Sequence, residues 1–573
     1  MARLESAKQQ STPEILPLDL PHSEDIGGGF FLRGGDRLHG MARALLLLFL
    51  LAGCAGAPPA TSPVRVRLIA LNDFHGHLEQ AASLSTAIAE LKRGRTNSIV
   101  VAAGDLVSAS PLASSILLDE PAVHVLDLMG LELSSTGNHE YDRGRAALAR
   151  LQQGGCDAEK GCFDGAYPGA QFKWLAANVF DTATGKTMLP AYAIREFEGI
   201  PVAFVGAVLR NTPEVVLRSG IAGLEFRDEA ESINALIPEI RAKGVEAIVV
   251  LIHEGGVMNA SLGSVPPPSA RYTCPGFEGA IVDIVKRLDR AVDVVVSGHT
   301  HQAYVCRIDG RLVTSSLSYG RVLTPIDITL DRATRDVVAS EAENIVVDRA
   351  RFPEDPAVAS YVEHIVKLSQ ASAGRVIGRI SGEFTATANA AGESNLGDLI
   401  ADAHLAASRA DVAFTNPGGL RAPIASKSPD GAITFGDLYA AQPFGNNLVT
   451  MTLTGAQILR ALEHQWRAPP DRTRILPVSE GFRYAWDGRK PIGQRIVAGS
   501  VTIQNRALDP QSRYRVVMND FLAHGGDGFA VFTEGIERTG GPLDVDALEN
   551  YMGLARRTAR SPGERIQRVD AAP

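Results

Sequence analysis

The stretch Leu68-Ile-Ala-Leu-Asn-Asp73-Phe-His75-Gly-His77 decides how this chain folds. Its apolar run, residues 64–71, ends abruptly at an Asp-x-His pair. Such a run predicts a buried parallel strand whose carboxyl end presents two side chains that can bind a metal ion. Taken alone, the pair is weak evidence, because an isolated Asp-x-His is more often part of a turn.

Four further apolar runs end in the same way. They cover residues 99–103, 131–136, 247–252 and 292–296, and they lead into Gly104-Asp105, Gly137-Asn138-His139-Glu140, His253-Glu254-Gly255 and Gly298-His299-Thr300-His301. The recurrence predicts that five strands converge on one site. Its candidate metal ligands are Asp73, His75, Asp105, Asn138, His253, His299 and His301.

These ligands combine carboxylate and amide oxygens with imidazole nitrogens. The set suits zinc, manganese or a similar divalent ion, and the absence of cysteine from it argues against a structural zinc site. Seven ligands exceed what one tetrahedral ion uses. With one shared carboxylate they fit two ions about 3.5–4 Å apart, the separation found in two-metal hydrolases.

Length and composition predict a globular protein with more than one domain. The 573 residues are 45% hydrophobic and 21% charged, and they are too many for a single core. Residues 64–345 alternate predicted strands and helices, which indicates a sheet with helices on both faces. Residues 346–375 contain a linker helix, and residues 376–573 form a second domain. The net charge of −9 argues against a nucleic acid polymer as partner.

The N-terminus contains a predicted export signal. Residues 43–51 place an arginine before an apolar run of signal-peptide length, and Leu51-Ala-Gly-Cys54 follows. This pattern resembles the bacterial lipoprotein signal, in which the cysteine is lipidated; the alternative is a short buried helix that ends at a cysteine. We expect an extension at 1–40 that is non-native or disordered, a signal peptide at 41–53, and a tether at 54–63. The protein would then be exported to the periplasm or cell surface, with Cys54 anchoring it to the membrane.

Four other cysteines suit an exported protein, namely Cys156, Cys162, Cys274 and Cys306. An even number permits two disulfides in three possible connectivities. Local pairing is expected, because residues 156–162 form a polar loop that a disulfide could close. A zinc site is the weaker alternative, since neither pair has the spacing of a zinc knuckle.

The ordered motifs Asp-x-His, Gly-Asp, Gly-Asn-His-Glu, His and Gly-His-x-His resemble those of the calcineurin-like metallophosphoesterases. The second domain adds Ser394-Asn-Leu-Gly-Asp-Leu399, Gly418-Gly-Leu-Arg421, Gln442-Pro-Phe-Gly-Asn446 and Gly525-Gly-Asp-Gly528, which look like loops of the 5′-nucleotidase and UDP-sugar hydrolase family. The resemblance covers residues 64 to about 560. It implies an α/β fold, with a four-layer α-β-β-α metallophosphoesterase domain at 64–345 and a smaller α+β substrate-binding domain at 376–573.

The resemblance also implies a role for each residue of the site. Asp73, His75 and His301 would hold one ion, Asn138, His253 and His299 the other, and Asp105 would bridge the two. His139 would contact the phosphate and assist the leaving group, with Asp142 fixing its tautomer. Glu140 and Glu254 are expected to support the ligands. Relatives can have Gln in place of His301.

The substrate positions implied by the resemblance are Asn416, Arg421, Phe444, Asn446, Phe521 and Asp527. Phe444 and Phe521 would clamp a nucleobase between them. One departure stands out, because many relatives carry an arginine where this chain has Ala390-Ala-Gly-Glu393. One positive contact to the substrate is therefore expected to be missing.

The expected function is that of an exported, monomeric dimetal phosphohydrolase. It would remove phosphate from 5′-nucleotides by attack of a metal-bound water, with UDP-sugars as further candidate substrates. The alternatives are a 2′,3′-cyclic phosphodiesterase/3′-nucleotidase, a thiosulfohydrolase of the same architecture, or a non-catalytic nucleotide-binding lipoprotein. The presence of all seven ligands together with His139 and Asp142 argues against the last.

Overall fold

The computed structural model describes residues 62–158, 161–163, 165–216, 220–258, 265–466, 473–553, 557–558 and 565–570. The expected extension, signal peptide and Cys54 lie outside these residues, as does all but the end of the 54–63 tether. Among the helices of the described residues, none has both the length and the apolar character that a membrane span requires.

Two sheets form the first domain. The first sheet consists of β1 (Val64–Leu71), β2 (Ser98–Ala103), β3 (Leu131–Ser135), β4 (Lys173–Leu175), β15 (Val322–Leu330), β16 (Val337–Ala342) and β17 (Ile345–Val346). Its order is β16-β15-β1-β2-β3-β4, with β17 paired to β15. Because β1, β2 and β3 run parallel, the loops after them open at the same edge of the sheet.

The second sheet carries the remaining ligand-bearing strands. It consists of β6 (Tyr192–Phe197), β7 (Ile200–Val208), β9 (Ala247–His253), β12 (Val294–Ser297), β13 (Ala303–Ile308) and β14 (Arg311–Ser316). The order is β13-β14-β12-β9-β7-β6, in which β7, β9, β12 and β14 are parallel. The five ligand-bearing strands therefore belong to two sheets.

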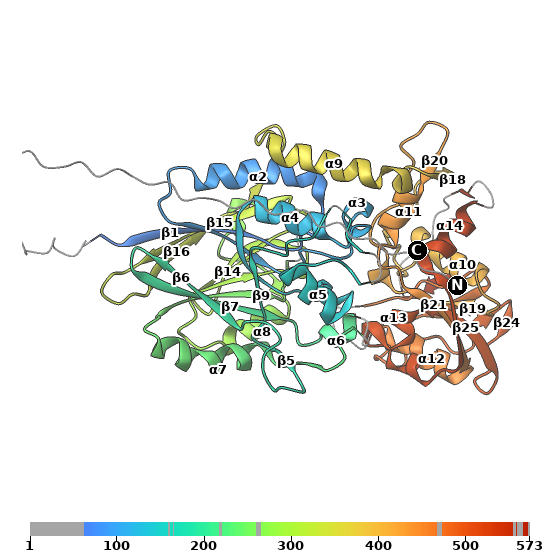
Figure 1. Ribbon diagram of the computed structural model, residues 1–573. Coiled ribbons are helices and arrows are strands. Elements are labelled where there is room, and N and C mark those ends of the chain that lie inside the picture. The colour runs from blue at the N-terminus through green and yellow to red at the C-terminus, as the bar shows by residue number, and fades with distance from the viewer. Residues whose placement is uncertain are drawn as a thin grey trace, which may run out of the picture. The chain divides into compact units, whose positions relative to one another are not determined.

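Helices cover the outer face of each sheet. Those on the first sheet are α2 (Leu78–Lys92), α4 (Glu120–Leu128), α5 (Gly144–Gln153) and α9 (Pro356–Ala373), and those on the second are α7 (Glu229–Ala242) and α8 (Ala280–Arg287). Figure 1 shows α2 and α9 side by side above the first sheet. The inner faces pack on each other, with Leu68 and Val101 of one sheet in the same core as Val249 and Val296 of the other. The four-layer α-β-β-α fold is thus confirmed.

The expectation of one sheet with helices on both faces is wrong. Along β1, Leu68 and Ala70 face the second sheet, whereas Ile69 and Leu71 face the helices. A continuous apolar run shows that both faces of a strand are buried. It does not show whether a helix or another sheet covers each face.

Residues 173–181 form two short strands, although their apolar character would also suit one continuous strand. β4 ends at Leu175, and β5 (Val179–Asp181) pairs instead with β8 (Leu224–Phe226). Between them the Asn178 side chain donates to Val208 O (2.6 Å) and accepts from Val208 N (3.0 Å) at the end of β7. The chain therefore leaves the first sheet at the point where the Asn178 side chain bonds to the second sheet.

The first domain also contains the short elements α3 (Leu112–Ser115), α6 (Thr212–Val215), β10 (Val257–Met258) and β11 (Phe277–Glu278).

The second domain combines small sheets with helices. Its strands are β18 (Val376–Ser381), β19 (Val412–Ala413), β20 (Ala432–Thr434), β21 (Asn447–Thr454), β22 (Phe482–Trp486), β23 (Thr502–Ile503), β24 (Arg506–Ala507), β25 (Arg513–Asn519), β26 (Ile536–Leu543), β27 (Arg557–Thr558) and β28 (Ile566–Arg568). Its helices are α10 (Asn395–Ala406), α11 (Phe435–Ala441), α12 (Gly455–His464), α13 (Asp520–Ala523) and α14 (Asp544–Gly553). The sheets have the orders β19-β25-β21-β26, β24-β23-β22-β28 and β20-β18-β27. This agrees with the expected α+β class.

Both disulfides are local. Cys156 bonds to Cys162 and Cys274 to Cys306, with Cα–Cα distances of 4.7 and 5.6 Å. The second ties the segment before β11 to β13. This is the pairing that we expected from the sequence.

The linker helix α9 is anchored to the first domain at its start. Asp355 caps it, since its Oδ1 accepts from Ala357 N (2.9 Å) and Val358 N (3.3 Å). Its Oδ2 accepts from the Ser85 hydroxyl on α2 (2.9 Å). Val358 and Ile365 are buried in the core beneath. One carboxylate therefore both starts the helix and fixes it to α2.

We expect Asp355→Ala to lower the free energy of unfolding by about 1–2 kcal/mol, because a helix cap is lost. Chemical denaturation of the purified protein measures this change. Glu354→Ala is the matched control: its side chain is 49% exposed and its ion pair with Arg349 lies at the surface. Equal effects of the two substitutions would contradict the anchoring role.

Candidate active site

All seven candidate ligands lie at the carboxyl ends of strands. Asp73 and His75 follow β1, Asp105 follows β2 and Asn138 follows β3. His253 is the last residue of β9, and His299 and His301 follow β12. The two sheets open at this edge, so loops from both meet there.

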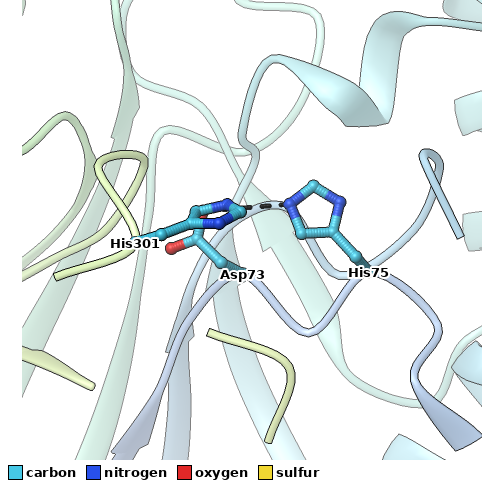
Figure 2. Close-up of side chains that lie close together, drawn as sticks. All are labelled: Asp73, His75 and His301. Atoms are coloured by element: carbon cyan, nitrogen blue, oxygen red, sulfur yellow. Dashed lines mark ion pairs between the residues drawn. The ribbon is translucent and has the colours of Figure 1, made fainter. Parts of the chain in front are cut away.

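The structure brings the His and Asp ligands into overlapping groups. These are Asp73 with His75 and His301; His75 with Asp105 and His139; and Asp105 with His253 and His299. Asp105 Oδ2 is 2.9 Å from His253 Nε2 and 3.6 Å from His75 Nε2. Asp73 Oδ1 is 3.2 Å from His301 Nε2, and Figure 2 shows Asp73, His75 and His301 pointing toward one another. Asp105 thus lies between the first group and the last, where a bridging carboxylate would sit.

The donor atoms fit bound cations. Asp73 Oδ1, His75 Nε2 and Asn138 Oδ1 are buried, and none has a hydrogen-bond partner within the described part of the chain. Leaving such an atom unsatisfied costs about 1–3 kcal/mol, so this convergence favours cation binding. On the far side of each ring, His75 Nδ1 donates to Ser108 O (2.9 Å) and His253 Nδ1 to Ala103 O (2.7 Å). These bonds turn both Nε2 lone pairs toward the centre.

The backbone at the ligands is strained. Five of them have left-handed φ angles: Asp73 (51°), His75 (47°), Asp105 (52°), His299 (71°) and His301 (52°). Each such residue costs on the order of 1–3 kcal/mol and persists only where surrounding contacts impose it. Strain concentrated at five converging side chains indicates a functional site.

Glu140 supplies some of these contacts. Its carboxylate accepts from Asp105 N (3.0 Å), Leu106 N (2.8 Å) and Gly137 N, which joins the loops after β2 and β3. Gly137 is required here, because a Cβ at this position would collide with the Asp105 carboxylate. The supporting role expected for Glu140 agrees with this geometry.

His139 lies beside the ligands and is held by two carboxylates. Its backbone N–H donates to Asp105 Oδ1 (2.9 Å), and its Nδ1 is 2.6 Å from Asp142 Oδ2. Burial would lower the pKa of the ring, but Asp142 and Asp105 outweigh it and raise that pKa. The pair with Asp142 occupies Nδ1 and leaves Nε2 as the atom that can give a proton to a leaving group.

A cavity of about 250 Å³ adjoins His139. The first domain contributes Asn138, His139, Asp142, Val215, Val216 and His299, and the second contributes Asn416, Gly418, Gly419, Arg421, Phe444, Asn446, Arg474, Phe521 and Asp527. All six residues expected to bind substrate therefore line the cavity that reaches His139. Phe444 also stacks on the His139 ring, with centroids 5.7 Å apart.

Sequence reasoning missed Arg474. Its Nη1 donates to Asp527 Oδ1 at 2.7 Å. Arg474 belongs to no recognisable motif, so only the tertiary contact reveals it.

Glu393, in the segment that lacks an arginine, is buried and accepts from Ile566 N (2.8 Å). That segment therefore has a structural role in this chain.

Two family models match the chain. The one described as calcineurin-like phosphoesterase matches residues 66–303, and the one described as the 5′-nucleotidase C-terminal domain matches residues 376–534. Endonuclease YhcR from Bacillus subtilis is 30% identical over 517 residues, which are 85% of this chain but only 40% of that protein. Cell wall protein Lmo0130 from Listeria monocytogenes is 30% identical over 563 residues, which are 90% of this chain and 71% of that protein.

A solved structure shares the whole architecture. The crystal structure of a 5′-nucleotidase precursor from Thermus thermophilus superimposes with a TM-score of 0.71 at 27% sequence identity. The match covers 89% of this chain and 100% of that chain. The likeness therefore extends over both domains.

The shared position of Asp105 leads to a prediction about metal content. Asp105→Asn should deplete bound metal from both groups and lower kcat by more than the roughly 10–100-fold that loss of an outer contact costs. His301→Gln should lose far less, because an amide oxygen can still bind an ion. Elemental analysis and kcat of both variants provide the comparison. Similar losses in the two variants would rule out a bridging role for Asp105.

Proposed function

The chain belongs to the family that joins a calcineurin-like phosphoesterase domain to a 5′-nucleotidase C-terminal domain, and on this premise we propose that it removes phosphate from 5′-nucleotides. As a member it is a metal-dependent phosphoester hydrolase. The observation that carries the proposal is the cavity, which joins His139 and Asn138 to two phenylalanines and an arginine of the second domain.

In the proposed reaction, the metal ligands, Arg421 and His139 have different roles. Divalent ions, when bound by the seven ligands, would polarise the phosphoryl group and activate the attacking water. Arg421 lines the cavity, and no carboxylate pairs with its guanidinium among the described residues. Its charge is therefore available to a phosphoryl oxygen. His139, oriented by Asp142, would donate a proton to the departing ribose oxygen.

Phe521 and Phe444 would hold the nucleobase, but they differ in their contacts. Phe444 stacks on His139, and the Arg421 guanidinium lies 5.7 Å from its ring centroid. A change at Phe444 would therefore disturb both the base contact and the catalytic histidine. Phe521 lines the same cavity from the short helix α13, and its ring lies against Gly526, so it is the cleaner test of base recognition.

We expect Phe521→Ala to lower kcat/KM for AMP by an amount corresponding to about 1–3 kcal/mol, the stacking energy of one aromatic face. For p-nitrophenyl phosphate, which has no base, the decrease should be much smaller. Phe444→Ala should affect both substrates, because it also touches His139. An equal decrease for both substrates in Phe521→Ala would contradict the clamp.

A substrate panel separates this proposal from its alternatives. AMP, UDP-glucose, a cyclic nucleotide and NAD, each assayed with added metal, distinguish a 5′-nucleotidase from a UDP-sugar hydrolase or a cyclic phosphodiesterase. The proposal requires AMP to be hydrolysed. Activity on thiosulfonate compounds alone, or binding of nucleotide without turnover, would overturn it.

We also propose that the protein is exported and anchored by a lipid on Cys54. The sequence Leu51-Ala-Gly-Cys54 after an apolar run supports this proposal, as do the local disulfides, which form in oxidising compartments.

Cell fractionation tests the anchor. The wild-type protein should be recovered with membranes and without residues 41–53, whereas Cys54→Ser should remain uncleaved or unlipidated. Ala55→Ser is a control next to the same site. Recovery of the wild-type protein in the soluble fraction with residues 41–53 still attached would refute the proposal.

A further inference from the structure

The orientation of the His75 ring depends on the backbone of Ser108. The Ser108 carbonyl oxygen accepts from His75 Nδ1 at 2.9 Å and from the Ser110 hydroxyl at 3.2 Å. The first of these bonds turns His75 Nε2 toward the other candidate ligands. The direction of that nitrogen is therefore set by the place at which the Ser108 carbonyl is held.

Ser108 cannot hold this position by itself. Its φ angle of 64° is left-handed, and so is the φ angle of Ala109, at 48°. Residues other than glycine adopt such angles only at a cost in free energy, so the conformation persists where surrounding contacts impose it. The segment that orients His75 therefore depends on a contact from elsewhere in the fold.

The carboxylate of Asp119 supplies this contact. Its Oδ2 accepts from Ser108 N at 3.2 Å, and its Oδ1 accepts from the Ser114 hydroxyl at 2.9 Å. The side chain is buried, and the Arg143 guanidinium lies 3.5 Å from Oδ2 with the opposite charge. A buried carboxylate that is paired and hydrogen-bonded in this way can remain an anion. Asp119 is therefore a fixed acceptor beside Ser108.

Capping of a helix would be the ordinary role of an aspartate at this place, because Asp119 directly precedes α4. The structure describes α4 completely, and no N–H group in its first turn donates to the Asp119 side chain. The Asp119 backbone is itself left-handed, with a φ of 63°. Asp355 shows the usual arrangement, since its carboxylate does cap its own helix, α9. Capping therefore does not explain the Asp119 carboxylate.

The segment that Asp119 holds also packs directly against the residue after His75. A Cβ at Gly76 would lie only 2.6 Å from Ser110 Oγ and 2.7 Å from Ser114 Oγ. Close-packed segments of this kind transmit a displacement from one to the other. A shift of residues 108–114 would therefore move His75 as well.

We propose that Asp119 is a positioning residue of the metal site, which holds Ser108 so that the His75 ring stays directed at a bound ion. The ion concerned is the one assigned to the group of Asp73, His75 and His301. Asp119 is not among the residues that line the substrate cavity. The inference therefore rests on the metal binding of the proposed function and is independent of its substrate.

Two substitutions separate the carboxylate of Asp119 from its backbone. Asp119→Gly removes both acceptor oxygens, whereas glycine adopts the left-handed φ without strain. Asp119→Asn keeps an oxygen for Ser108 N, its amide group can donate to the Ser114 hydroxyl, and asparagine tolerates this φ. We expect Asp119→Gly to weaken the binding of one ion by about 10–100-fold, the loss found when an outer contact to a metal ligand is removed. Asp119→Asn should keep most of the affinity.

Metal affinity is measured on the full-length protein loaded with Mn²⁺. A chelator of known affinity removes the ions, and electron paramagnetic resonance reports the free Mn²⁺. Circular dichroism shows whether each variant is folded before the titration. If Asp119→Gly does not fold, Ser114→Ala provides the test, because it removes one of the two hydrogen bonds to the carboxylate. It should weaken the same ion by a smaller factor, and unchanged affinity in this variant would contradict the proposal.

Glu198→Gly is the matched control. Glu198 is also an acidic residue with a left-handed φ, at 49°, and it also pairs with an arginine, Arg332. It lies in the turn between β6 and β7, at the amino end of β7 and thus at the edge opposite the ligands. This variant should bind both ions as tightly as wild type does.

The pattern of losses decides the outcome. Unchanged affinity in Asp119→Gly, an equal loss for both ions, or the same loss in Asp119→Asn as in Asp119→Gly would overturn the positioning role. Failure of wild type to retain Mn²⁺ would overturn it too. Retention of both ions without hydrolysis of AMP would overturn the proposed function alone.

Discussion

The carboxylate of Asp105 is the point on which the site depends. One oxygen lies 2.9 Å from His253 and 3.6 Å from His75, and the other accepts the backbone N–H of His139. A single charged group thus connects both groups of ligands with the candidate catalytic histidine.

The backbone of Asp105 is strained in this position, and contacts from neighbouring loops are needed to maintain its conformation. Its φ is left-handed, as are those of four other ligands. Glu140 opposes this strain by accepting backbone N–H groups of Asp105, Leu106 and Gly137. Each residue of the Gly-Asn-His-Glu motif therefore has its own part in the site. Gly137 leaves room for the Asp105 carboxylate, and Asn138 is a candidate ligand. His139 is a candidate acid, and Glu140 holds the neighbouring backbone. These hydrogen bonds hold the backbone of Asp105, Leu106 and Gly137 in place without a substrate, and electrostatic catalysis depends on such preorganisation.

The candidate catalytic residues and the candidate substrate contacts come from different domains. The ligands and His139 belong to the two-sheet domain, whereas Arg421, Arg474 and the two phenylalanines belong to the second. Phe444 links the two, because it stacks on His139 from the substrate side. Substrate preference can therefore change through loops of the second domain while the metal ligands stay the same. Within the second domain, the buried Glu393 accepts from Ile566 N and so ties β28 to the segment at residues 390–393.

The sequence by itself predicted most strands of the first domain and the candidate site residues that follow them. Apolar runs that end in candidate ligands depend on local order along the chain, and β1 has the bounds that its pattern predicted. The resemblance supplied the four layers and the substrate positions. Only the tertiary structure decided that the ligand-bearing strands divide between two sheets, because an apolar face does not specify what packs on it. It also revealed Arg474, whose partner Asp527 is 53 residues away in the chain. No local pattern encodes such a pair, because it forms only when separate loops fold onto one cavity.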